Sequence, residues 1–398
     1  MAALDGMRIL DMTQYEAGTS CTQMLAWLGA DVVKVERPEH GDPGRRVGGS
    51  GRGGSSAYFL NYNSNKRSVA LSLRSEEGRS LLLQLVPKFD AFVENYGPGV
   101  MEKLGIGYDV MRTLNPRIIY ARIKGFGLSG PYSSFNCYDQ VAQATGGSFS
   151  VTGERGGTPL LSGATFADSG TGAQLALAIT AAYVQQQRTG EGQLIELSMQ
   201  EAVTMFMRTQ VALFSDWGRK TAPRDAIRAG FSPDPLACKP GGSNDYIYMV
   251  IVTPEMWAGV CETIERPDLL QDERFATLQG RRQNRDALHA ELAKWTASRT
   301  KYEAMEAFGA RGVPCGAVMD TRDLFENPHL QARDFIQHVD HPTEGRVPLM
   351  RPAAQLSNSP VTMEPAPLLG QHTDEVLREE LGLDDTELAT LREAGTVG

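Results

Sequence analysis

The sequence has few cysteines, and they form no recognisable pattern. Five cysteines are spread over 398 residues without a CxxC spacing, so neither a disulfide framework nor a zinc site is indicated, and a reducing compartment is the natural reading. No apolar stretch reaches the roughly 18 residues that a membrane span needs, and the first residues lack the basic and apolar regions of a secretion signal. We therefore expect a cytoplasmic protein with no membrane partner.

An excess of positive charge is also missing. The chain has 39 Lys and Arg against 48 Asp and Glu, which gives a formal net charge of −9. Because proteins that bind the phosphate backbone depend on clustered Lys and Arg, we expect no nucleic-acid partner. The six histidines show no metal-ligand spacing, so we expect no metal site.

Several common catalytic motifs are absent. The turn after the first predicted strand, residues 13–19, reads TQYEAGT and has a single glycine, so the GxGxxG cradle of a dinucleotide is missing. The sequence also lacks GxxxxGK[ST], GxSxG and HExxH. These absences argue against nicotinamide dehydrogenases, P-loop enzymes, α/β-hydrolases and zincin proteases.

The sequence does contain a regular alternation of strand and helix patterns. Residues 8–12 and 31–36 read as strands and enclose a helical pattern at 19–28, which is a βαβ unit with parallel strands. The alternation continues with strands at 68–73, 91–95, 117–123 and 193–198, and helices at 75–86, 138–145 and 171–187. It predicts an open α/β sheet with helices on both faces, within a large domain over residues 1–223.

The pattern of residues along the chain changes near residue 224, where we expect a second, smaller domain over residues 224–330. A loop rich in Pro and Gly (Gly230 to Gly242) opens it, followed by a strand at 245–252 and helices at 256–264, 281–297 and 302–310. Residues 331–398 then form a linker, Pro-rich at 347–367, and two short helices, 374–380 and 385–394, which we expect to pack on the large domain.

One acidic residue stands out. Asp168 lies immediately before the long predicted helix, where backbone N–H groups and the positive helix end would keep a carboxylate ionised and available as a nucleophile. The alternative is an ordinary N-cap. Basic residues near strand or helix ends could form a phosphate pocket, although such residues are more often solvated surface; they are Lys34, Arg37, Lys66, Arg67 and Lys103.

Taken in order, segments along nearly the whole chain resemble the family III CoA-transferases of the CaiB/BaiF type, a group that includes formyl-CoA transferases, carnitine CoA-transferases and 2-methylacyl-CoA racemases. The resemblance is carried by Ala17-Gly18, Cys21-Thr22-Gln23, 28–36 (LGADVVKVE), 65–68 (NKRS), 94–99 (ENYGPG), 124–127 (KGFG), 138–144 (YDQVAQA), 167–172 (ADSGTG), 312–316 (GVPCG) and 367–373 (PLLGQHT).

The resemblance implies a fold, a partner and substrates. It implies a Rossmann-like large domain and a smaller α+β domain, in a subunit interlocked with a second copy as a homodimer. An acyl-CoA and a carboxylic acid would be the substrates, with no prosthetic group. Asp168 matches the catalytic aspartate, which in the family forms an acyl-aspartyl anhydride and then an aspartyl-CoA thioester.

The resemblance also assigns binding residues. It places Glu16, Gly18 and Tyr138 at the acyl pocket. For the CoA phosphates and adenine it points to Arg37, Lys66, Arg67, Asn95, Tyr96, Lys103 and Lys124.

Two positions depart from the family pattern. Tyr138 stands where racemase relatives carry a histidine, and loss of that base favours transfer over α-proton exchange. Glu16 stands where oxalate-handling members carry Gln, and a carboxylate facing the pocket would repel a second carboxylate. The four-glycine run of those members is replaced by Gly230–Pro235, so the acceptor acid and any lid formed by Gly230 to Gly242 stay open.

Two other functions remain open at this point. One is a 2-methylacyl-CoA racemase that uses Asp168 with another base. The other is a non-catalytic CoA-binding subunit in which Asp168 only caps its helix.

Overall fold

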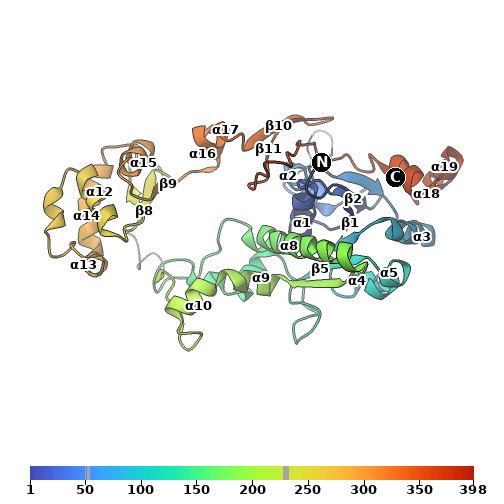
Figure 1. Ribbon diagram of the computed structural model, residues 1–398, viewed down its shortest axis with the longest axis horizontal. Helices are drawn as coiled ribbons and strands as arrows, with labels where there is room; N and C mark the ends of the chain where they lie inside the picture. The colour runs from blue at the N-terminus through green and yellow to red at the C-terminus, as the bar shows by residue number, and fades with distance from the viewer. Residues whose placement is uncertain (50, 52–53, 227–232) are drawn as a thin grey trace. The chain divides into compact units, whose positions relative to one another are not determined.

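A computed structural model describes residues 1–49, 51, 54–226 and 233–398, and the chain forms two compact units within them (Figure 1). The first unit comprises Met1–Phe149, Leu161–Arg208 and Asp334–Gly398, and the second comprises Ser150–Leu160 and Thr209–Arg333. The second unit therefore starts earlier than the boundary expected at residue 224.

The first unit is built on a parallel sheet, which confirms the predicted α/β class. Among the described residues six strands pair in the order β3-β2-β1-β4-β5-β6, all parallel, which is the strand order of a doubly wound nucleotide-binding sheet. The strands are β1 (Arg8–Met12), β2 (Asp31–Glu36), β3 (Arg67–Ala70), β4 (Ala91–Glu94), β5 (Ile119–Lys124) and β6 (Leu194–Ser198).

Both faces of this sheet are covered, and its strands contribute buried apolar side chains to a core on each face. Along β1 successive side chains enter opposite cores, with Ile9 on one side and Leu10 and Met12 on the other, as the pleat requires. The helices that contribute to the first core include α1 (Ala17–Ala26), α6 (Asp139–Thr145), α8 (Phe166–Thr189) and α9 (Met199–Phe206); those of the second include α3 (Glu76–Leu85), α4 (Val100–Lys103), α5 (Tyr108–Leu114), α18 (Thr373–Leu381) and α19 (Asp385–Glu393).

The C-terminal helices were expected on the large domain, and this is where they lie. α18 packs against β3 and α3, and Figure 1 shows α18 and α19 at the β3 end of the sheet. The sequence correctly predicted the start of α3, because the Ser75 hydroxyl accepts the N–H of Gly78 as an N-cap. The remaining short helices of this unit are α2 (Ala57–Tyr62), α7 (Ser148–Val151) and the 3₁₀ turns Pro43–Arg46 and Val86–Lys88.

Two sequence-based expectations for the first unit are wrong. The long helix α8 begins at Phe166 rather than at residue 171, so Asp168 lies inside its first turn. The linker contains an antiparallel hairpin, β10 (Ile336–His341) and β11 (Gly345–Met350), that was not predicted. β11 contains Pro348, and a two-stranded hairpin has free edges where a residue without an N–H is tolerated.

The second unit has its own antiparallel sheet and apolar core. β8 (Tyr246–Met249) pairs with β7 (Leu236–Ala237) and β9 (Cys315–Ala317), and the core gathers around large side chains such as Trp257 and Phe308. Its helices are α10 (Arg208–Phe214), α12 (Pro254–Thr263), α13 (Leu278–Gln283), α14 (Arg285–Thr296), α15 (Lys301–Gly309), α16 (Thr321–Glu326) and α17 (Pro328–Ala332), with a 3₁₀ turn at Pro267–Leu270.

In the second unit, the helix expected over 281–297 is divided into α13 and α14 at Asn284. The loop proposed as a lid begins at Gly230, and residues 230–232 lie outside the described part of the chain. Further along, the same segment includes β7.

α1 and α8 pack side by side on one face of the sheet (Figure 1), and Gly172 is a point of close approach between them. A Cβ at Gly172 would meet the Ser20 hydroxyl and lie 2.6 Å from the Ala17 carbonyl oxygen. Since backbone stands in the way, the two helices could accommodate a side chain there only by moving apart.

Gly172→Ala should therefore destabilise the first unit by about 1–3 kcal/mol. The control is Gly163→Ala in the same unit, where a Cβ meets nothing within 4 Å, and we expect its effect to stay within about 0.5 kcal/mol. Denaturant unfolding of the three proteins measures both. Equal midpoints for all three would contradict close packing at Gly172.

Candidate functional site

The carboxyl edge of the parallel sheet carries a cavity of about 300 Å³. Its walls are the segments that follow β1, β4, β5 and β6, so it lies where the strand order reverses between β1 and β4, which is where open α/β sheets bind ligands. The lining residues are Gln14, Tyr15, Glu16, Ala17, Asn95, Tyr96, Gly97, Pro98, Ile123, Lys124, Gly125, Phe135, Asn136, Cys137, Tyr138, Asp168 and Met199. Six of the expected site residues are among them: Glu16, Asn95, Tyr96, Lys124, Tyr138 and Asp168.

A second cavity, of about 720 Å³, lies at the same edge beyond β2 and β3. Tyr96 lines both cavities, so the two are neighbours along the sheet edge. The second cavity brings together Arg37, His40 and Arg74. Of these, only Arg37 was expected in a binding site.

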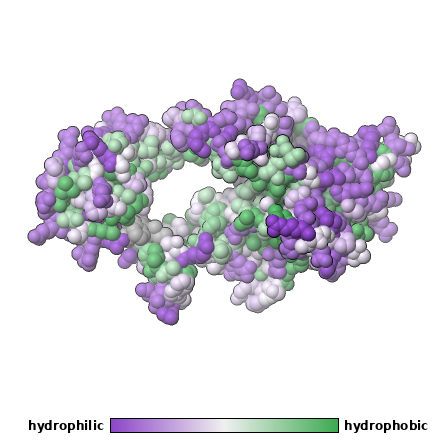
Figure 2. Space-filling model, in the orientation of Figure 1, coloured by the Kyte–Doolittle hydropathy of each residue, from purple (hydrophilic) through white to green (hydrophobic). Residues whose placement is uncertain are grey.

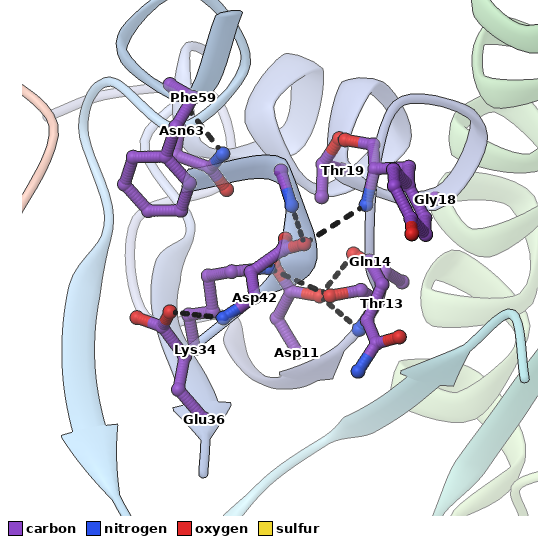
Figure 3. Close-up of polar contacts among 12 residues, drawn as sticks. Asp11, Thr13, Gln14, Gly18, Thr19, Lys34, Glu36, Asp42, Phe59 and Asn63 are labelled. Carbon is purple, nitrogen blue, oxygen red and sulfur yellow. Dashed lines mark hydrogen bonds and ion pairs between the residues drawn. The ribbon is translucent and has the colours of Figure 1, made fainter. Parts of the chain in front are cut away.

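The loop between β1 and α1, residues 13–16, forms one wall of the first cavity and is held by buried polar groups (Figure 3). The Lys34 ammonium donates to the Thr13 carbonyl oxygen at 2.7 Å, and the Asp42 carboxylate accepts the Tyr15 N–H at 3.1 Å. The Asn95 amide binds Gln14 twice, accepting its N–H and donating to its carbonyl oxygen, at 2.8 Å each.

The charged groups beneath this loop are paired with one another. Lys34 is 2.9 Å from Asp42, and Lys66 is 3.0 Å from Asp11. Burial raises the pKa of Asp11, but Lys66 and Lys34 outweigh this and hold it below its usual range. Buried pairs of this kind do not favour folding strongly, but removal of one partner leaves an uncompensated buried charge. The network therefore keeps loop 13–16 in one place.

This network changes the interpretation of Lys66. Its ammonium is buried and donates to Asp11, to the Thr19 carbonyl oxygen and to the Asn63 side chain. Burial lowers its pKa to about 8. Lys66 lines neither cavity. Its charge interacts with buried groups at the sheet edge rather than with a ligand, contrary to the expected contact with CoA.

Three further expected residues also lie away from the two cavities. Arg67 begins β3 and binds Asp31 at 2.7 Å; it is at the amino end of its strand, whereas both cavities lie at the carboxyl ends. Lys103 ends α4, is exposed and lines neither cavity. Gly18 is buried in α1, where a Cβ would meet Thr13. Its lack of a side chain allows α1 to pack against Thr13, and Gly18 itself does not line the cavity.

Asp168 is the third residue of α8 and does not cap it, so the simple N-cap interpretation is wrong. The N-cap is Thr165, whose side chain makes no capping bond. Instead the Asp139 carboxylate reaches across from α6 and accepts the N–H groups of Ala167 at 3.0 Å and Asp168 at 3.1 Å. The backbone donors expected to stabilise an ionised Asp168 are thus used by Asp139.

The surroundings of Asp168 disfavour its charged form. Burial, the nearby Glu16 carboxylate and Asp139 together raise the pKa of Asp168 to about 8. The expectation that the helix end keeps it fully ionised is therefore corrected. A carboxyl group that titrates near neutral pH in a cavity wall can act as a nucleophile or as a base, because it gains and loses its charge within the working range.

Glu16 and Tyr138 line the same cavity as this carboxyl group. Glu16 is only 2% exposed, and its Oε1 accepts the hydroxyl groups of Thr165 at 2.6 Å and Ser169 at 2.7 Å. Tyr138 is 61% exposed and packs edge-to-face on Tyr15, with ring centroids 6.1 Å apart.

Lys124, the last residue of β5, is the one cation among the described residues that line the first cavity. Its ammonium donates to Glu94 at 2.9 Å and to the Tyr96 carbonyl oxygen at 2.5 Å. Burial lowers its pKa. Its positive charge is therefore already balanced by a buried glutamate.

Sequence reasoning missed several residues of this site. His40 was assigned a solvated or structural role, and Arg74 was not singled out, although it directly follows a predicted strand end. Asp139 was noted only as part of a matching segment; its role as a cap depends on the approach of α6 to α8, which no local pattern reveals.

The described residues contain no group of three or more His, Cys, Asp and Glu side chains arranged for a metal ion. Among them, no helix has the length and apolar character required to cross a bilayer.

Comparison with known proteins agrees with this picture along the whole chain. Residues 4–373 match the family described as CoA-transferase family III. Two similar curated proteins, each named formyl-CoA:oxalate CoA-transferase, come from Streptomyces coelicolor and Rhodopseudomonas palustris. They are 40% and 38% identical over 99% of this chain, covering 99% and 97% of their own lengths.

Similar folds occur among solved structures. A CaiB/BaiF family protein from Brucella suis has a TM-score of 0.84 at 31% identity, with 95% of this chain and 99% of that one covered. Rv3272 from Mycobacterium tuberculosis has a TM-score of 0.79 at 29% identity, with 94% and 98% covered.

Proposed function

This chain belongs to CoA-transferase family III, and on that basis we propose that it moves CoA between an acyl-CoA and a free carboxylic acid in the cytoplasm, with Asp168 as the covalent carrier. One observation carries the proposal: the Asp168 carboxyl lines a cavity at the strand-order reversal of the sheet. The relatives named formyl-CoA:oxalate CoA-transferase support the reaction class.

The two neighbouring cavities match the shape of CoA, which has a charged nucleotide end and a thioester at the end of a long arm. Arg37 and Arg74 in the larger cavity suit the phosphate groups, since guanidinium groups bind phosphate well. Tyr96, shared by both cavities, would lie beside the arm. The thioester would then reach Asp168 in the smaller cavity.

The proposed reaction proceeds by exchange of bonds at Asp168. Its carboxylate oxygen attacks the thioester carbonyl carbon, the C–S bond breaks and CoA leaves as a thiolate, giving an acyl-aspartyl anhydride. The thiolate attacks the aspartyl carbonyl carbon and releases the donor acid as its carboxylate. The acceptor carboxylate then attacks this aspartyl-CoA thioester, and the thiolate finally attacks the acceptor's acyl carbon, which frees Asp168.

This sequence conserves the energy of the thioester at each step, so it needs no ATP. Backbone N–H groups at Gly97 and Gly125, both in the cavity lining, are candidates to stabilise the negative oxygen that develops during each attack.

Asp168→Asn should reduce transfer by about 10³-fold or more, because an amide cannot form the anhydride. Among the described residues the Asp168 side chain makes no hydrogen bond or ion pair, so the variant should keep the melting temperature of the wild type. Transfer at near wild-type rate by Asp168→Asn would refute the role. As a direct check, incubation with acyl-CoA and hydroxylamine should leave a hydroxamate on Asp168, detected by mass spectrometry of peptides, and none on the variant.

Since only the carboxylate attacks, kcat/KM should follow the ionisation of Asp168 in the free enzyme. Its pKa is raised to about 8 by burial, Glu16 and Asp139, so kcat/KM should rise about tenfold per pH unit below that pH and level off above it. Glu16→Gln removes a nearby negative charge and should move the midpoint to lower pH. Glu77→Gln, an exposed change on α3, is the control. A flat profile from about pH 6 to about pH 9 would contradict an elevated pKa.

We also propose that the protein is a homodimer and that α8 lies at its interface. Ala173, Leu177, Ala181 and Val184 form an exposed apolar stripe at helical spacing along α8, and Leu177 is 72% exposed. Figure 2 shows hydrophobic surface over the α8–α9 part of the first unit. A stripe of this kind on a central helix is typical of a surface that another chain covers.

Light scattering should therefore give a mass of twice 43.3 kDa for the wild type. Leu177→Glu places a charge in the stripe and should shift the mass toward that of one chain, whereas Glu77→Gln should leave it unchanged. A wild-type protein that is monomeric at micromolar concentration would contradict the proposal. The interlocking of the two subunits stays a prediction.

A further inference from the structure

We propose that Glu16 selects the acceptor of the transfer, favouring acids whose remainder carries no negative charge and discriminating against small dicarboxylates such as oxalate. The inference rests on the proposed CoA transfer and names its substrate class. It separates this chain from relatives that are named for oxalate.

Glu16 is built into the wall of the cavity as an anion. Its Oε1 accepts hydroxyl groups from Thr165 and Ser169, which stand on either side of Asp168 in the sequence. A carboxylate oxygen is an acceptor and suits two O–H donors. These two contacts fix its position next to Asp168.

The negative charge of Glu16 has no balancing cation nearby. In the described part of the chain no Lys, Arg or His forms an ion pair with it, in contrast to Asp11, Glu36, Asp42 and Glu94, each of which has a cationic partner. Lys124, the cation in the cavity lining, is committed to Glu94. Among the described residues that line the cavity, Glu16 therefore supplies a negative charge and no unpaired cation is present to receive a second carboxylate.

The charge of Glu16 matters most when the acceptor binds. At that stage Asp168 is a thioester in the proposed sequence and carries no charge, so Glu16 is the uncompensated anion that the acceptor meets. Every acceptor brings one carboxylate for the attack. A dicarboxylate brings a second negative charge into a cavity of about 300 Å³, and two negative charges at short distance repel each other more strongly there than in bulk water.

Pairs of acids that match in size and differ in charge test the inference. Oxamate replaces one carboxylate of oxalate by an amide, and malonamate and succinamate do the same for malonate and succinate. Rates of new thioester formation, measured with formyl-CoA and with acetyl-CoA as donors, give kcat/KM for each acid. For the wild type we expect kcat/KM to be at least about tenfold higher for the amide acid of each pair.

Glu16→Gln keeps an oxygen that can accept the Thr165 and Ser169 hydroxyl groups but removes the charge. We expect it to lower the preference for oxamate over oxalate at least about tenfold, mainly through a lower KM for oxalate. Glu77→Gln removes one negative charge from an exposed position on α3 that is outside the lining of both cavities, and it should leave the preference unchanged.

The possible results separate the two proposals. If no acid in the panel receives CoA from either donor, the proposed transfer itself fails and this inference fails with it. If transfer occurs and the wild type uses oxalate as well as oxamate, or if Glu16→Gln leaves the preference as it was, only the role of Glu16 is overturned. Should Glu16→Gln fail to fold, the wild-type ratios for the three pairs decide the question.

Discussion

The site depends on how the start of α8 satisfies its free backbone N–H groups. Asp139 accepts the N–H groups of Ala167 and Asp168, while Thr165, the residue in the N-cap position, gives its hydroxyl to Glu16. Asp168 is thereby left in the first turn of a helix without the donors that normally stabilise an acid there. The same contacts bring three carboxyl groups close together, and burial together with this crowding raises the pKa of Asp168.

The loop at residues 13–16, which also lines the cavity, is held in another way. Two buried lysines, Lys34 and Lys66, are paired with acids beneath the loop that carries Glu16. Ion pairs inside a protein recover little of the free energy that is lost when the charges leave water. Their contribution here is to position a short loop, because this loop belongs to neither a strand nor a helix.

Much of this could be predicted from the sequence. Alternating strand and helix patterns predicted the parallel sheet, and the family resemblance assigned Asn95, Tyr96 and Lys124 to the site. Asp168 was singled out because it lies where a predicted helix begins. Lys66 and Arg67 carry the same local signal, yet one is buried with Asp11 and the other sits at the amino end of β3. Local sequence shows that a charge lies near an element's end, but not the direction in which its side chain points.

The order of apolar and polar residues by itself determined the fold class, because burial on both faces of a parallel sheet requires nearly continuous apolar strands separated by helices. It also singled out Asp168 as a candidate, since this residue precedes an apolar helical run. Only the tertiary structure decided how that acid behaves. Its ionisation depends on Glu16 and Asp139, which are distant from it in the chain, and electrostatic interactions follow distance in space rather than separation in sequence.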